Sequence, residues 1–98
     1  MKRNLVIAEL ERHADAIKSI GATGLYLFGS TARDEAEDDS DIDLFVDYDA
    51  SGRFSLIDLI SIKQLVEAAM DAQIDITTRD SLHPMLKHEI EQSSIRIF

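Results

Sequence analysis

The segment from residue 41 to residue 47 places the strongest constraint on the fold of this chain. Its residues alternate between apolar and mainly acidic ones with a period of two. That period predicts a β-strand whose two faces differ. One face holds Ile42, Leu44 and Val46, and the other holds Asp41, Asp43, Phe45 and Asp47. The first two aspartates leave the same face about 6.6 Å apart along the backbone. One face can therefore pack while the other carries chemistry.

A glycine-led segment, Gly29-Ser30-Thr31-Ala32-Arg33, lies upstream of these carboxylates. The apolar run over residues 25–28 predicts a strand that ends at this glycine. A glycine ahead of a small hydroxyl residue at a helix start lets the backbone approach an anion, and the free N–H groups of the first turn point at that anion. We expect Gly29 and Ser30 to hold phosphates and Arg33 to neutralise part of their charge.

The remaining segments predict helices that alternate with strands. We expect helices over about residues 4–19, 55–71 and 82–92, and strands over residues 25–28, 41–47, 73–78 and 94–98. Ser55 and Asp58 form a capping-box pattern, and Pro84 is tolerable only in the first turn of its helix. The order α-β-α-β-α-β-α-β, which includes the helical turn after the first strand, favours a layered α/β or α+β sheet covered by helices.

The strand over residues 73–78 supplies a third carboxylate. Ile74 and Ile76 point to one face and Asp75 to the other, so Asp75 can join Asp41 and Asp43 if the two strands are neighbours. Three close carboxylates repel one another and normally require a cation. Mg²⁺ prefers such oxygen ligands, and two Mg²⁺ ions would support an in-line phosphoryl or nucleotidyl transfer. Asp41 and Asp43 would be metal ligands, and Asp75 the third ligand or the base.

Composition limits the remaining function classes. The 98 residues predict a single domain over residues 1–98, with no cysteine for disulfides or thiolate metal sites. The start of the chain does not resemble a signal peptide and no long apolar run occurs, so we expect a cytoplasmic protein without membrane contact.

The net charge of the chain is −9, and nine of its nineteen acidic residues lie between Asp34 and Asp49 with no basic residue among them. Direct nucleic-acid binding is therefore not expected.

Residues 29–43 fit the pattern G-S-x-x-R-G-x5-S-D-x-D except at one glycine. This pattern resembles the signature of the nucleotidyltransferase superfamily that includes the DNA polymerase beta palm. Over nearly its whole length, the chain resembles the minimal nucleotidyltransferases that act as antitoxins of HEPN-domain toxins. The resemblance implies a nucleotidyltransferase fold with a mixed sheet of about four strands, ATP with Mg²⁺, and a complex with a HEPN toxin. It also implies transfer of AMP to a toxin hydroxyl, that of a tyrosine.

One departure from the pattern concerns Asp34, which stands where the family has glycine. Aspartate can adopt the left-handed conformation, so the turn can survive, but the added charge beside Arg33 would weaken nucleotide binding. A second hypothesis is therefore an inhibitory module that neutralises the toxin by binding alone. A third, transfer to a small molecule, normally needs an added helical domain to grip the acceptor.

Other side chains receive structural interpretations. We expect Met70 and Met85 to fill the core, and Arg79 to form a salt bridge with Asp80 or a neighbouring acid rather than to reach a phosphate. Tyr48 and Phe54 flank the loop after the acidic strand, where they would edge either the nucleotide pocket or a partner interface.

Overall fold

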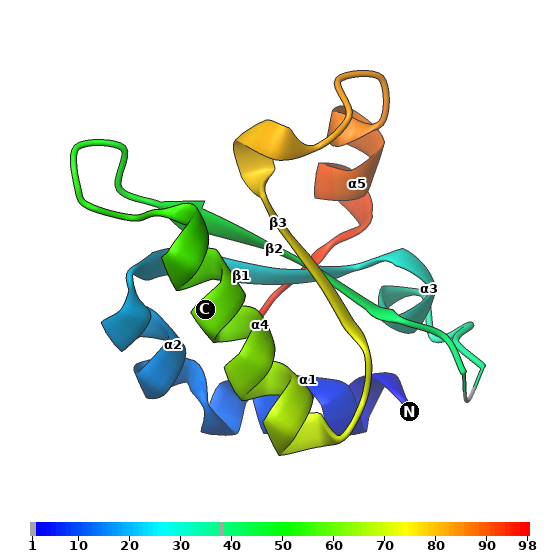
Figure 1. Ribbon diagram of the computed structural model, residues 1–98. Helices are drawn as coiled ribbons and strands as arrows, with labels where there is room; N and C mark the ends of the chain where they lie inside the picture. Colours follow the sequence, from blue (N-terminus) through cyan, green and yellow to red (C-terminus); the bar gives the residue numbers. More distant parts are fainter. Residues whose placement is uncertain (1, 38) are drawn as a thin grey trace.

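The computed structural model describes residues 2–37 and 39–98, so Asp38 of the acidic run lies outside the described residues. In chain order, the elements are α1 Arg3–Arg12, α2 Ala14–Ile20, β1 Ala22–Phe28, α3 Gly29–Ala32, β2 Ile42–Tyr48, α4 Leu56–Met70, β3 Ile74–Thr78, the 3₁₀ turn η1 Arg79–Ser81, α5 Lys87–Ser93 and β4 Ile95–Arg96. Figure 1 shows the strands crossing the middle of the molecule between helices.

The strands form one mixed sheet in the order β3-β2-β1-β4. β1 pairs antiparallel with both β2 and β4, whereas β2 and β3 are parallel because α4 carries the chain back between them. Parallel neighbours require such a crossover. This arrangement confirms the expected four-stranded mixed sheet flanked by helices, including the short edge strand at the end of the chain.

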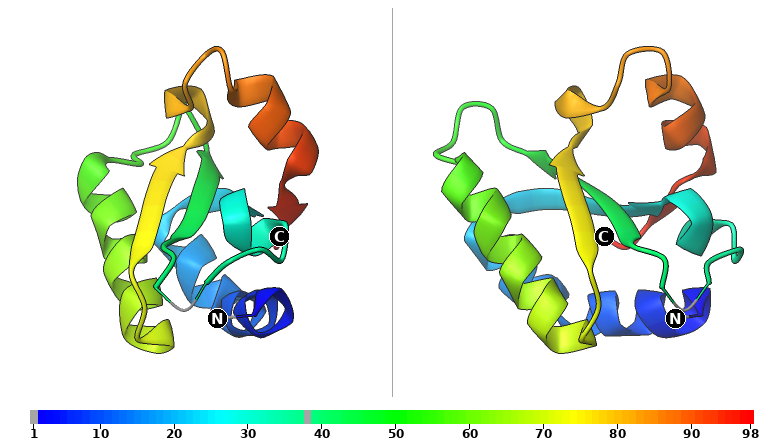
Figure 2. Two further views of the ribbon diagram at one scale, coloured as in Figure 1. Left: turned by 90° about the vertical axis from the view of Figure 1, so that its right-hand side faces the viewer. Right: turned by 45° about the vertical axis from the view of Figure 1, so that its right-hand side comes forward.

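One face of the sheet carries the main core. α1, α2 and α4 lie together beneath the strands in Figure 1, and the two turned views in Figure 2 show the same layer. Its buried members include Val6, Leu10, Ile17, Leu25, Leu27, Ile42, Leu44, Val46, Ile62, Val66, Met70 and Ile74. All three apolar residues expected on the inner face of β2 are among them, so the alternation in this strand is confirmed.

The opposite face combines chemistry with packing. Phe45, expected beside the acidic residues, is 0% exposed. Its ring stacks on Tyr26 at 4.6 Å between centroids and lies 5.8 Å from Phe28. Arg79 covers this aromatic group, with its guanidinium carbon 4.7 Å from the Tyr26 ring centre. Acidic residues on this face therefore border a small second packed cluster.

Two helix boundaries differ from the sequence expectation. The helix expected over residues 4–19 is two helices, because the chain breaks at His13, whose Nδ1 lies 2.9 Å from the Glu9 carbonyl oxygen. α5 begins at Lys87 rather than near residue 82, since Pro84 lies in a separate turn. In that turn the Met85 N–H donates to His83 Nδ1 at 3.2 Å. In both cases a histidine side chain bonds the local backbone and competes with regular helix.

The start of α4 follows its sequence closely. Ser55 and Asp58 form the reciprocal capping box that their spacing predicts, and the helix ends at Asp71 in a left-handed conformation. Met70 fills the core as expected, but Met85 is 86% exposed, so that expectation is wrong. Met85 lies in the turn before α5, and this turn projects beyond the packed layers.

Candidate active site

Asp43 and Asp75 are register partners on the parallel strands β2 and β3. Because side chains alternate along both strands, these two carboxylates leave the same face of the sheet at neighbouring positions. Asp41 lies just before β2, is exposed, and lines with Asp75 a hollow beside Lys63 and Glu67 of α4. The structure therefore gathers all three expected carboxylates at one end of the β2 and β3 pair.

The electrostatics of Asp43 reflect this gathering. Its pKa is raised chiefly by partial burial and further by the negative charges of Asp75 and Asp41, while the positive charge of Arg33 acts in the opposite direction. A raised carboxyl pKa means that the ionised form costs free energy in the folded protein. A bound cation would remove that cost.

Gly29 brings the phosphate turn against Asp43. Its φ of +75° lies in the left-handed region, and a Cβ at this position would fall within 2.3 Å of Asp43 Oδ2. A side chain here would therefore collide with the carboxylate as well as strain the backbone. Glycine is required at residue 29 because the turn and the acidic strand approach each other this closely.

The rest of the turn adopts the conformation that the motif predicts. Gly29–Ala32 form the short helix α3, and Arg33 follows with an exposed side chain whose Nε lies 3.2 Å from Glu35 Oε2. Asp34 adopts φ of 59°, so aspartate does take the left-handed conformation of the usual glycine. Ser30 is half-buried in α3. The departure from the family pattern leaves the turn intact and adds a negative charge next to Arg33.

The carboxylates on β2 and β3 are suitable ligands for Mg²⁺. Asp43 and Asp75 offer hard carboxylate oxygens at neighbouring positions, and Asp43 has the raised pKa of an uncompensated acid. Among residues 2–37 and 39–98, however, no three acidic or histidine side chains are already arranged to enclose a metal ion. Mg²⁺ typically takes one or two carboxylates and completes its shell with substrate phosphates and water. The residues therefore fit an ion that arrives with a phosphorylated substrate.

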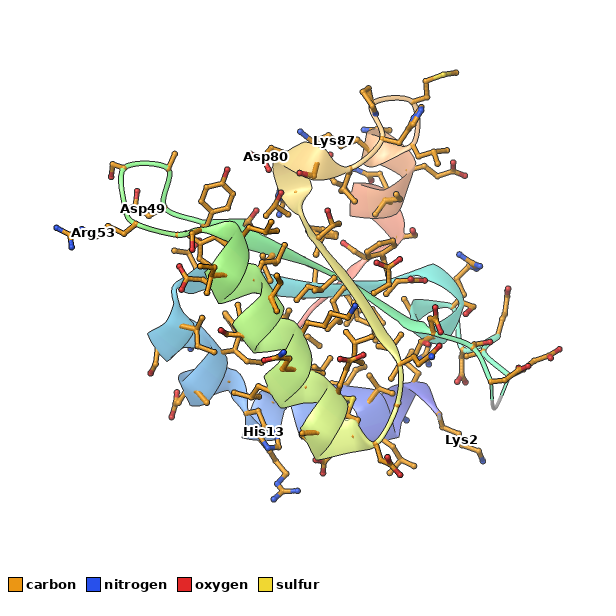
Figure 3. All side chains as sticks on the ribbon, viewed as in Figure 1. Lys2, His13, Asp49, Arg53, Asp80 and Lys87 are labelled. Atoms are coloured by element: carbon orange, nitrogen blue, oxygen red, sulfur yellow. The ribbon has the colours of Figure 1, made fainter. Side chains whose placement is uncertain are left out.

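Tyr48, Phe54 and Arg79 lie away from these carboxylates. Tyr48 is five residues beyond Asp43 on β2, about 16 Å along the strand. Its ring stacks on Phe54 at 5.2 Å, beside the loop that carries Asp49 and Arg53. Figure 3 shows that loop at the opposite end of the molecule from α3. The Tyr48 and Phe54 pair therefore does not border the carboxylates.

Arg79 forms salt bridges, as its sequence position predicted, although its partners are not Asp80. Its Nε lies 2.7 Å from Asp47 Oδ1, and its Nη1 pairs with Glu91 of α5. The hydrogen bonds that Arg79 donates to the Asp47 carboxylate are the largest influence raising the Arg79 pKa. These contacts connect η1, β2 and α5, so the arginine holds α5 against the aromatic face of the sheet.

Sequence reasoning missed one hollow next to the turn. Phe28 and Gly29 line it from the sheet side, Arg33 lies at its rim, and Leu86 and Ile90 face it from the region of α5. Ser93 and Glu89 complete its lining. The four-residue spacing of Leu86 and Ile90 was the available signal, because an apolar pair at that spacing marks one side of a helix.

Comparison with known proteins agrees with this geometry. Residues 10–97 match the nucleotidyltransferase domain family, and the chain belongs to that family. It is therefore a nucleotidyltransferase, of the minimal type expected from its motif. A Thermococcus cleftensis relative, named protein adenylyltransferase MntA, is 31% identical over 80% of this chain and 82% of its own. The Methanocaldococcus jannaschii protein MJ0435, provisionally named a protein adenylyltransferase, is 37% identical over 72% of this chain and 74% of its own.

Solved structures show the same fold. One, described provisionally as a minimal nucleotidyltransferase, is 29% identical, with a TM-score of 0.84 over 97% of this chain and 95% of its own. A second, from Shewanella oneidensis, contains an MNT antitoxin with its HEPN toxin; it has a TM-score of 0.65 over 98% of this chain and 71% of its own, at 18% identity. Within the described residues, no helix has both the length and the apolar character needed to cross a membrane.

Proposed function

We propose that this nucleotidyltransferase transfers AMP from ATP to a hydroxyl of a HEPN-domain toxin and so acts as its antitoxin. The observation that carries the proposal is the pairing of Asp43 with Asp75 directly against the Gly29 turn. The name of the Thermococcus relative supports AMP transfer to a protein. The Shewanella antitoxin, which shares the fold, is described in complex with a tri-AMPylated HEPN toxin.

The proposed roles follow the positions of the side chains. The N–H groups of the turn and Ser30 would hold the phosphates, and the exposed Arg33 would neutralise part of their charge. Asp41, Asp43 and Asp75 would hold Mg²⁺, which supplies charge neutralisation of the phosphates during transfer. We propose that Asp75, which is exposed, also accepts the proton of an incoming hydroxyl.

A protein acceptor is supported by the surface of α4. Leu56 and Ile57 are 71% and 75% exposed, and Ile60 lies on the next turn of the same helix. Contiguous exposed apolar side chains commonly mark a protein interface.

We propose that the chain acts as a single domain in the cytoplasm, in a hetero-oligomer with the toxin and without contact with nucleic acid or membrane.

The proposal is tested by incubating the purified chain with labelled ATP, Mg²⁺ and the HEPN toxin. The toxin should gain label and the mass of AMP, and Asp41→Asn combined with Asp43→Asn should abolish both. Asp49→Asn is the matched control, since this exposed aspartate lies in the loop beyond the other end of β2. Labelling that survives the double substitution contradicts the site assignment.

A second candidate is an inhibitory module that neutralises the toxin by binding alone. The exposed acids around Asp34 favour it, because a concentrated negative surface attracts a basic partner and the attraction weakens with salt. In that case the double substitution at Asp41 and Asp43 should still neutralise the toxin. If neutralisation is lost while the complex stays intact, transfer is the function.

A further inference from the structure

We propose that the hollow between Gly29 and α5 binds the base of the incoming nucleotide. This inference rests on the proposed function and specifies which part of the chain receives the nucleoside portion of the substrate. Phe28, Leu86 and Ile90 give the hollow apolar walls, and Gly29 and Arg33 belong both to the hollow and to the phosphate turn. A ligand held at the turn can therefore extend into the hollow without leaving the surface.

The position of Phe28 connects the hollow to the carboxylates. Phe28 is the register partner of Asp43 across β1 and β2, and it lies on the face that Phe45 and Arg79 share. The next residue, Gly29, approaches the Asp43 carboxylate closely enough to exclude a side chain. Two consecutive residues therefore border both the carboxylates and the hollow.

The chemistry of the lining suits a nucleobase. A base presents flat apolar faces and polar edges, and it gains binding free energy from stacking on aromatic rings and on guanidinium groups. The Phe28 ring is only half-buried, and Arg33 leaves its guanidinium exposed at the rim. Leu86 is 49% exposed although it is a large apolar residue, as expected for a wall that a ligand covers.

The α5 wall is held in place from the far side. Glu91, one residue beyond Ile90, pairs with Arg79, which is fixed on β2 through Asp47. The backbone of α5 thus has a polar anchor on the sheet while its apolar residues line the hollow. A preformed wall lowers the ordering cost of binding.

The experiment compares two probes by calorimetry in the presence of Mg²⁺: a non-hydrolysable ATP analogue and inorganic tripolyphosphate. Leu86→Asn removes the apolar wall and places a residue type favoured at helix N-caps, because Leu86 is the N-cap residue of α5 and makes no side-chain cap bond. Met85→Asn is the matched control. The Met85 side chain lies next to Leu86 in sequence, but it is 86% exposed and does not line the hollow. Ser93→Phe fills the hollow from the end of α5.

The ATP analogue should bind about tenfold more weakly to Leu86→Asn and to Ser93→Phe, which corresponds to about 1.4 kcal/mol. Tripolyphosphate should bind both variants as it binds the unmodified chain, and Met85→Asn should change neither affinity. Thermal unfolding of each variant would check that it is folded.

Three results would overturn the inference. Equal losses for both probes would mean that the substitutions act on the phosphate turn. Unchanged analogue binding with slower transfer to the toxin would assign the hollow to the acceptor. If the unmodified chain binds neither probe, the proposed function fails together with this inference, whereas the first two results leave that function standing.

Discussion

Gly29 and Asp43 approach so closely that only a hydrogen atom fits between the glycine Cα and the carboxylate, since a Cβ would lie 2.3 Å from Asp43 Oδ2. The glycine of the motif is thus explained by contact with the motif's own aspartate, and its positive φ adds a second reason. The two halves of the motif constrain each other in space as well as in sequence.

Gly29→Ala should therefore destabilise the fold and disturb the site. The strained backbone should cost about 1 to 3 kcal/mol, and the displaced carboxylate should reduce transfer. Urea unfolding and the toxin-labelling assay measure the two effects. Gly52→Ala is the control, because residue 52 does not have a positive φ; an equal loss of stability in the control would argue against the explanation.

Asp43→Asn should stabilise the metal-free protein at neutral pH while it abolishes transfer. The raised pKa of Asp43 means that its contribution to stability is largest at acidic pH and is lost as pH rises through that pKa. The neutral amide avoids this loss, so the melting temperature should rise near pH 7. The gain should vanish at a pH below the ordinary aspartate range, where both side chains are uncharged.

Asp49→Asn supplies the opposite case. Hydrogen bonds from Ser51 lower the Asp49 pKa, so ionisation of this carboxyl favours folding as pH rises. The substitution should bring no gain in melting temperature near pH 7. A similar rise in both variants would show that reduced net charge, rather than the surroundings of Asp43, is responsible.

Asp34→Gly should improve nucleotide binding. Glycine takes the φ of 59° without steric cost and removes a negative charge beside Arg33. We expect a gain in stability of up to about 1 kcal/mol, together with roughly two- to fivefold tighter binding of an ATP analogue by calorimetry. Asp71→Gly relieves the same backbone conformation at the end of α4, so it should raise stability and leave nucleotide affinity unchanged.

Arg79→Met should loosen α5. The substitution keeps an apolar stem over Tyr26 but leaves Asp47 and Glu91 without their cation, at a cost of about 2 kcal/mol. Denaturant unfolding gives the loss, and amide exchange should accelerate most in α5. Arg12→Met removes an exposed salt bridge to Glu9 and should cost no more than about 1 kcal/mol. Equal costs would mean that the Arg79 contacts carry no special weight.

Much of the fold was predictable because it depends on local patterns. The alternation around Leu44 identifies the inner face of β2, and the Ser55 and Asp58 capping box fixes the start of α4. The same alternation around Asp75 placed its carboxylate on the face opposite Ile74 and Ile76, and the parallel pairing of β2 with β3 brings it beside that of Asp43. These patterns have a period of two or a spacing of three residues, so they can be read without knowing what packs against them.

Features that depend on distant contacts were not predictable. The position of Phe45 on the acidic face gives no sign of its complete burial, which results from Tyr26, Phe28 and Arg79. The break at His13 depends on a side-chain bond to the backbone within an otherwise regular helical pattern. The hollow beside Gly29 exists only because α5 returns to that turn.

The parallel pairing of β2 with β3 places the whole of α4 between the two carboxylates that are register partners. The recognisable motif is complete by Asp43, yet the neighbouring carboxylate arrives only when the crossover has closed. Long-range pairing of this kind generally forms late in folding. A ligand that requires both carboxylates would bind the completed fold and not its folding precursors. Because it binds only the completed fold, the ligand would stabilise that fold against unfolding. Nucleotide affinity would then also measure what fraction of a sample has completed its folding.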